Sequence, residues 1–80
     1  MNQCKAIVDY MREHGSISNS EAVIKLGIGR LQARISDLRS AGHLYGLEEG
    51  EYIETTMTEF QNKYTGRKGK YAEYSIVKAV

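Results

Sequence analysis

The sequence predicts an α+β fold in which three helices are followed by a β-hairpin. In the first half of the chain, apolar residues recur with the period of a helix. After Gly42 the pattern changes to the alternation of strands, and a basic segment containing glycines separates two such stretches. We expect the 80 residues to form one domain, residues 1–80, with the helices in 1–43 and the strands and hairpin in 44–80.

Composition narrows the class of protein further. Hydrophobic residues make up 41% and charged residues 26%, which is ordinary for a globular protein. The single cysteine excludes an internal disulfide, and the longest apolar runs are too short for a signal peptide or a membrane span. We therefore expect a soluble, cytoplasmic protein that has no contact with membranes.

The first helix is expected over residues 3–13. Asn2 is a suitable N-cap, and Gly15 can end the helix in the left-handed conformation. Residues 16–18 then predict one short strand with Ile17 turned inward. The apolar stripe of the helix consists of Cys4, Ile7, Val8 and Met11.

Two more helices follow closely. The second helix is expected to start between Ser18 and Ser20 and to end at Gly27: Ser18 and Glu21 have the spacing of a capping box, and Ser20 is the alternative N-cap. Its core-facing residues are expected to be Ala22, Val23 and Leu26. The third helix is expected over residues 30–41, and its apolar stripe is Leu31, Ile35 and Leu38. Because the connection between them is so short, these helices should cross at a large angle, as in a helix-turn-helix.

The rest of the chain predicts strands. Residues 43–45 are expected to form a short strand and residues 48–51 a solvated turn. Residues 52–59 and 70–77 should form a hairpin with a long tip over 60–69. One face of its strands carries Ile53, Thr55, Met57, Ala72, Tyr74 and Ile76.

Helix, short strand, helix, helix and hairpin is the order of a winged helix-turn-helix. The stretch LGIGRLQARISDLRSAG, residues 26–42, resembles the small winged helix-turn-helix proteins common in bacteriophages and prophages, as does the opening QCKAI at residues 3–7. The resemblance covers residues 3–44, and the hairpin matches in kind. It implies a fold that binds DNA.

The third helix offers a surface suited to a major groove. Small residues opposite its apolar stripe allow close approach, and Arg30 and Gln32 can read guanine and adenine. Asp37 is expected either to accept from cytosine or to hold Arg34 or Arg30 in place. The same small, polar face would also suit a solvated helix. The candidate DNA contacts are Arg30, Gln32, Ala33, Ser36, Arg39 and Ser40.

Charge is uneven along the chain, although the net charge is only +1. Residues 44–60 contain five glutamates and no base, and the basic residues that follow cluster in the hairpin tip, where they can neutralise phosphates. The candidate contacts there are Lys63, Tyr64, Arg67, Lys68 and Lys70. The acidic stretch 48–59 is expected to be a solvated edge, to pair with lysines on the neighbouring strand, or to face a protein partner.

The sequence contains no catalytic or metal-ligating constellation. His14, His43 and Cys4 lack metal-ligand spacing, and Cys4 belongs to an apolar stripe. We expect no enzymatic activity, no cofactor and no metal. The tyrosines other than Tyr64 are expected to fill the core and the sheet; they are Tyr10, Tyr45, Tyr52, Tyr71 and Tyr74.

Two functions from different classes follow from these features. The first is sequence-specific binding of duplex DNA by a phage or prophage transcriptional regulator in the host cytoplasm, with the third helix in the major groove and the wing on the phosphate backbone. The second is binding of a host or phage protein, as in a phage-encoded inhibitor of a host defence complex such as an anti-CRISPR. The acidic stretch and the near-neutral charge favour the second. The sequence also leaves a homodimer as an alternative to a monomer, since no heptad repeat or exposed apolar stripe defines a dimer interface.

Overall fold

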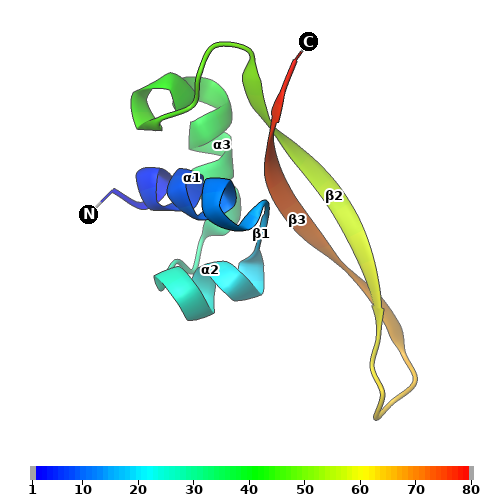
Figure 1. Ribbon diagram of the computed structural model, residues 1–80. Helices are drawn as coiled ribbons and strands as arrows, with labels where there is room; N and C mark the ends of the chain where they lie inside the picture. Colours follow the sequence, from blue (N-terminus) through cyan, green and yellow to red (C-terminus); the bar gives the residue numbers. More distant parts are fainter. Residues whose placement is uncertain (1, 80) are drawn as a thin grey trace.

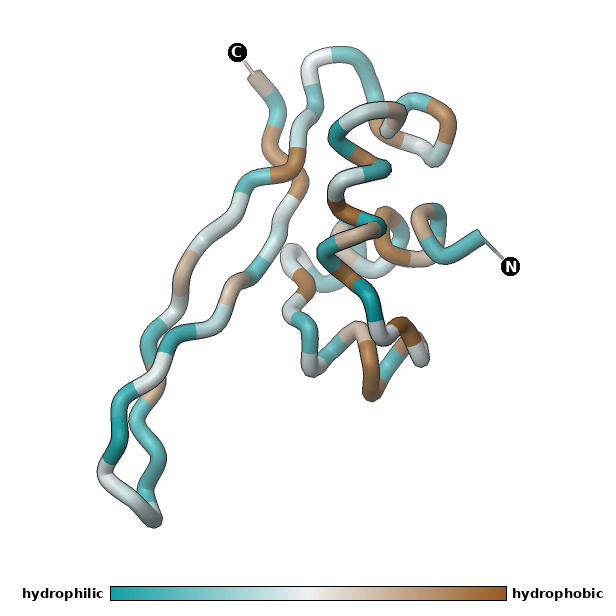
Figure 2. Tube along the Cα trace, turned by 180° about the vertical axis from the view of Figure 1, so that it is seen from behind, coloured by the Kyte–Doolittle hydropathy of each residue, from teal (hydrophilic) through white to brown (hydrophobic). Residues whose placement is uncertain are grey.

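The computed structural model describes residues 2–79 and contains, within them, three α-helices and a three-stranded antiparallel sheet (Figure 1). The helices are α1 (Gln3–His14), α2 (Asn19–Leu26) and α3 (Leu31–Ala41), and a 3₁₀ turn, η1 (Gly42–Tyr45), follows α3. The strands are β1 (Ile17–Ser18), β2 (Glu51–Gln61) and β3 (Lys68–Lys78), in the order β1-β3-β2. The β2–β3 hairpin extends far beyond the helices (Figures 1 and 2).

The helix boundaries follow from local capping groups. The Asn2 side chain accepts a hydrogen bond from the first turn of α1, and Ser18 and Glu21 form the predicted capping box of α2. Gly15 ends α1 and Gly27 ends α2. The sequence therefore predicted both helix starts correctly, because each depends on residues only three positions apart.

One apolar core joins the helices to the base of the hairpin. The predicted stripes of α1 and α3 are buried in full, and Ile53 of β2 and Tyr74 of β3 close the core from the sheet. The buried apolar residues are Cys4, Ile7, Val8, Met11, Ile17, Ala22, Ile28, Leu31, Ile35, Leu38, Leu47, Ile53 and Tyr74. Because the last core residue of β2 is Ile53, the base of the hairpin is anchored and its distal half projects into solvent.

The predicted strand over residues 43–45 is wrong: these residues belong to η1. The backbone N–H of Leu47 donates to the Gly42 carbonyl at 3.1 Å, and Leu47 packs into the core directly against Gly42, where a side chain would collide with it. The chain must turn tightly to make this contact. Here a tertiary contact decides the local structure.

One residue expected to face the core, Val23, lies at the surface instead. Val23 is 55% exposed, because the buried side of the short helix α2 is formed by Ala22 and, in part, Leu26. Tyr52 and Tyr71 lie in the sheet, as expected, and are about half exposed, since strand alternation puts them on the face opposite Ile53 and Tyr74. The other expected core residues of these elements are buried or pack against the core.

The hairpin is longer, and its tip shorter, than predicted. The strands continue to Gln61 and Lys68, so the connecting turn consists only of residues 62–67. The pairing of Ile53 with Ile76 and of Thr55 with Tyr74 identifies the side of the hairpin that faces the core. By alternation, this helix-side face continues toward the tip with Met57, Glu59, Gln61, Lys68, Lys70 and Ala72. The opposite, outer face carries Tyr52, Glu54, Thr56, Thr58, Phe60, Tyr71, Glu73, Ser75 and Val77.

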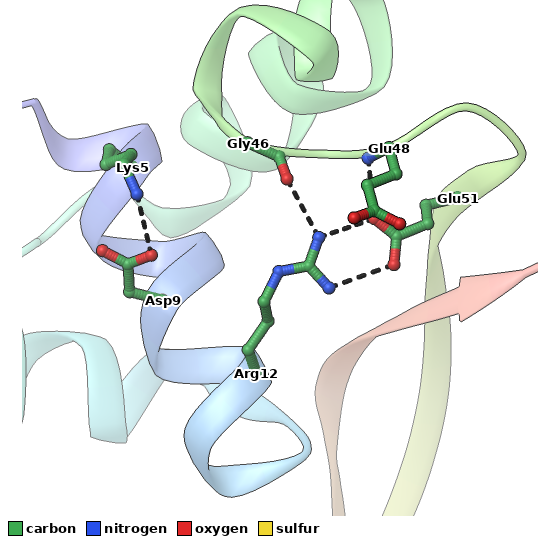
Figure 3. A network of polar contacts seen from close by, with 6 residues as sticks. All are labelled: Lys5, Asp9, Arg12, Gly46, Glu48 and Glu51. Atoms are coloured by element: carbon green, nitrogen blue, oxygen red, sulfur yellow. Dashed lines mark hydrogen bonds and ion pairs between the residues drawn. The ribbon is translucent and has the colours of Figure 1, made fainter.

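An ion pair ties α1 to the start of β2 (Figure 3). The Arg12 guanidinium donates to both carboxylate oxygens of Glu51, at 2.6 and 3.0 Å, and to the carbonyl of Gly46 at 2.9 Å. The hydrogen bond from Arg12, together with one from the backbone of Glu48, lowers the pKa of Glu51 to about 2. The negative charge of Glu51, one of the five glutamates of the acidic stretch, is thus balanced by Arg12 of the same chain.

This pair makes the stability of the fold depend on pH. Glu51 binds its proton at a lower pH in the folded chain than in the unfolded chain, where its pKa is about 4.5, so its contribution to stability is present above that value and is lost as the pH falls toward 2. We expect Arg12→Met to lower the urea midpoint near neutral pH. The gap between variant and parent should close as the solution is acidified, and a gap that stays constant would contradict the assignment.

Candidate nucleic-acid interface

The helix α3 presents a polar face of small residues to solvent. Its apolar stripe is buried, and Figure 2 shows the helix upright in front of the other elements, uncovered on its outer side. Arg30 lies at the N-cap, one residue earlier than the helix itself, and is exposed. Of the other candidate contacts on α3, Ala33 is half-buried, and the exposed ones are Gln32, Ser36, Arg39 and Ser40.

A groove of about 450 Å³ lies between α2, α3 and the hairpin. Gln32 enters it from α3, and Lys70 enters it from β3. The remaining lining residues are Ser18, Asn19, Ser20, Thr55, Met57, Tyr71, Ala72 and Tyr74. One polar residue of α3 and one cation of the hairpin therefore line the same concave surface, although they are far apart in the sequence.

Asp37, the one acid on α3, is paired within its own helix. Its carboxylate lies 3.2 Å from Nε of Arg34, one turn earlier. This pairing is one of the alternatives that the sequence predicted for Asp37. Both residues line a hollow next to Cys4 that shares no residue with the groove. Burial and the negative charge of Asp37 raise the pKa of the Cys4 thiol, which donates weakly to the Arg34 carbonyl. Cys4 is therefore a packing residue.

Arg39 connects α3 to the hairpin. Its Nη2 donates to the hydroxyl of Thr55 at 2.8 Å and to the carbonyl of Ile53 at 3.2 Å. The contact is made just where β2 leaves the core, so it helps to set the angle between α3 and the projecting hairpin. The sequence predicted Arg39 as a DNA contact and gave no sign of this link to β2. Nothing local reveals this contact, because its partners lie beyond the turn in another element.

The hairpin tip is an ordered basic turn. The Asn62 side chain accepts from the backbone N–H groups of Tyr64, at 2.8 Å, and Thr65, at 3.1 Å. The ammonium of Lys63 lies 5.2 Å from the centre of the Tyr64 ring. All the candidate contacts that the sequence placed in the tip are exposed: Lys63, Tyr64 and Arg67 lie in the turn, and Lys68 and Lys70 lie at the start of β3.

Aromatic contacts stabilise the distal hairpin, and one long, exposed ion pair spans its two strands. The Phe60 ring lies over Gly69 on the partner strand, where it occupies the space of a side chain, and its centre is 6.0 Å from that of Tyr71. A two-stranded ribbon needs such contacts, because it is marginally stable alone. On the helix-side face, the Glu59 carboxylate lies 3.8 Å from the Lys70 ammonium on the neighbouring strand. Such a pair is one of the alternatives predicted for the acidic stretch 48–59.

Three helices followed by a projecting hairpin define a winged helix, a class of DNA-binding domain. The family model of the winged helix-turn-helix domain matches residues 2–79, and the chain belongs to this family. The fold is typically non-enzymatic. No curated protein and no solved structure matches the chain significantly.

Two further features bear on the kind of site. Among residues 2–79, no group of three or more histidine, cysteine, aspartate or glutamate side chains could hold a metal ion. None of the helices in this part of the chain has the length and apolar character needed to cross a membrane.

Proposed function

We propose that the protein binds duplex DNA sequence-specifically, with α3 in the major groove and the hairpin tip on the phosphate backbone. The shared groove is the observation that carries this proposal. Gln32 and Lys70 line one concave surface, and alternation along β3 puts Lys68 on the same face of the hairpin as Lys70. One duplex could therefore meet α3 and the wing together.

The distribution of charge supports this orientation. The basic tip and the start of α3 lie toward one end of the molecule, and the turn that carries Glu48 and Glu49 lies at the other (Figures 1 and 2). Glu51 and Asp37 are paired with arginines, Glu54 points to the outer face, and Glu59, which does lie on the helix-side face, has Lys70 at 3.8 Å. The surface offered to the duplex is therefore more positive than the net charge of +1 suggests.

Each candidate contact has a role in this proposal. Arg30 and Gln32 read base edges, and Ala33, Ser36 and Ser40 allow the helix to approach closely. Arg39 positions the wing. The cations of the tip contact phosphates, and the resemblance to phage proteins supports a phage or prophage transcriptional regulator acting in the bacterial cytoplasm.

Replacing Arg30 and Gln32 with alanine is expected to relax sequence preference. One good bidentate contact discriminates against the wrong base by about 1–3 kcal/mol. The ratio of affinities for a duplex selected from a random pool and a scrambled duplex should therefore fall by roughly five-fold to a hundred-fold per residue. Fluorescence-anisotropy titration measures both affinities. Lys5→Ala on α1 is the control and should leave the ratio unchanged, whereas a native protein that binds no duplex at low salt would refute the proposal.

The link between Arg39 and Thr55 gives a second test of the orientation. Thr55→Val removes the acceptor of Arg39 but no charge, and Thr55 also lines the groove, so the double variant with Arg39→Ala is needed to separate a shift of the wing from a lost contact of Thr55 itself. We expect a loss of about two- to five-fold, and no additional loss when Thr55→Val is combined with Arg39→Ala, because coupled residues are non-additive. Additive losses, or an inert Thr55→Val, would show that Arg39 acts on DNA independently of the strand.

A second candidate function is binding of a protein at the end of the molecule formed by η1 and the turn that carries Glu48 and Glu49. Leu44 is 67% exposed there, and its neighbour His43 shares a hollow of about 350 Å³ with Glu48 and Glu49. An exposed leucine beside carboxylates suits a partner with a basic, partly apolar surface. Nuclease-resistant recovery of one stoichiometric host protein, abolished by Leu44→Ser and by Glu48→Lys, would favour this function.

A further inference from the structure

We propose that Tyr64, at the apex of the hairpin tip, is a base-stacking residue that engages a nucleobase unstacked from the bound duplex. The inference rests on the proposed DNA binding and adds to it a preference for DNA with a locally unpaired base. The Tyr64 side chain is 86% exposed. It belongs to the segment 62–67, which stands clear of the helices in both views (Figures 1 and 2).

Hydrogen bonds within the turn hold the backbone that carries this ring in a defined conformation. Asn62 accepts from the backbone of Tyr64 and Thr65, and its own backbone N–H donates to the Arg67 carbonyl at 2.8 Å. The backbone N–H of Gly66 donates to the Asn62 carbonyl at 2.8 Å, and that of Arg67 donates to the Thr65 hydroxyl at 3.2 Å. A ring presented from an ordered turn loses less entropy on binding than one on a flexible loop.

The charges around the ring identify the ligand as a nucleic acid. Residues 61–70 contain four cations and no carboxylate. An apolar protein pocket would have to bury or repel these charges, whereas a nucleic acid offers phosphates to the cations and a π face to the ring. Stacking on an aromatic side chain tolerates any base, because every base has such a face. The same ring beside Lys63 can therefore act at any sequence.

The length of the hairpin separates this site from the bases under α3. From Ile53, the last core residue of β2, to Gln61 the strand advances by about 26 Å, at roughly 3.3 Å per residue. That length matches about seven to eight steps of B-DNA. Tyr64 should therefore meet the duplex outside the segment that α3 reads, at one preferred distance from it.

This distance determines the design of the test. A duplex that carries a site selected from a random pool is prepared fully paired, and then with one unpaired 2-aminopurine at successive positions outward from the site. At one position or two adjacent positions, we expect the native protein to bind at least about five-fold more tightly than to the paired duplex, and to quench the 2-aminopurine fluorescence by stacking. Tyr64→Ala should lose both effects, and Tyr64→Trp should keep both.

Tyr52→Ala is the matched control, because Tyr52 is another exposed tyrosine at the opposite end of the same hairpin. It should keep the preference and the quenching. Retained binding of the paired duplex shows that each variant is folded. Equal affinity of the native protein for all duplexes, or quenching that survives Tyr64→Ala, overturns the inference alone. If the native protein binds neither paired nor unpaired DNA, the proposed function falls together with the inference.

Discussion

Replacing Lys68 and Lys70 together with glutamine is expected to weaken duplex binding by about sixty-fold near 0.1 M salt, for every sequence. Each phosphate contact contributes about −0.9 to the slope of log K against log salt, so each lost contact costs roughly eight-fold at that concentration. Both side chains are exposed on the helix-side face, and the pair between Lys70 and Glu59 is too long and too solvated to hold the lysine back.

Anisotropy titrations over a range of salt concentrations measure this effect, and the slope should fall by about 2. The matched control is the pair Lys5→Gln and Lys78→Gln, which removes the same charge from α1 and from the end of β3 near the core. It should change affinity by less than about three-fold, because charges beyond about a Debye length are screened. If both double variants weaken binding equally, net charge and not the wing controls affinity.

Ile35→Ala is expected to destabilise the fold by about 2–5 kcal/mol. Ile35 lies in the middle of the buried stripe of α3 and is 2% exposed, so its truncation leaves a cavity in the core. A domain this small has only a small reserve, since total stabilities of about 5–15 kcal/mol are usual. The variant should therefore unfold at a much lower urea concentration than the parent, which circular dichroism measures.

Val23→Ala provides the contrast, because it removes a similar apolar group from a position that the structure leaves exposed. Surface substitutions of this kind change stability by less than about 0.5 kcal/mol. If Val23→Ala were as costly as Ile35→Ala, α2 would have to be rotated so that Val23 faces the core. The comparison thus separates the observed packing from the one that the sequence alone suggested.

The sequence predicted the fold well wherever structure depends on neighbours along the chain. The stripes of α1 and α3, the capping box at Ser18 and the alternation of the hairpin all involve residues within a few positions of one another. The mistakes arose where distant contacts decide. Residues 43–45 turn because Leu47 packs against Gly42, and Val23 is exposed because a short helix needs only one buried side.

In the candidate site too, features that depend on neighbouring residues could be predicted, and features that depend on distant contacts could not. The basic tip could be predicted because its cations are close together in the sequence, and the pairing of Asp37 with Arg34 was one of the local alternatives. The groove that Gln32 shares with Lys70 could not be predicted, since the angle of the hairpin depends on the core and on contacts such as that of Arg39 with Thr55. Periodicity predicts which residues share one face of a helix or strand, but it does not predict the relative orientation of the helices and strands.

An NMR titration with a duplex selected from a random pool measures most directly whether one DNA molecule meets both surfaces. The amide shifts of residues 30–40 and of residues 63–70 should change together, with the same affinity, while those of the turn at 46–50 stay in place. Shift changes in only one of the two segments, or with different affinities for the two, would mean that α3 and the wing do not share a duplex.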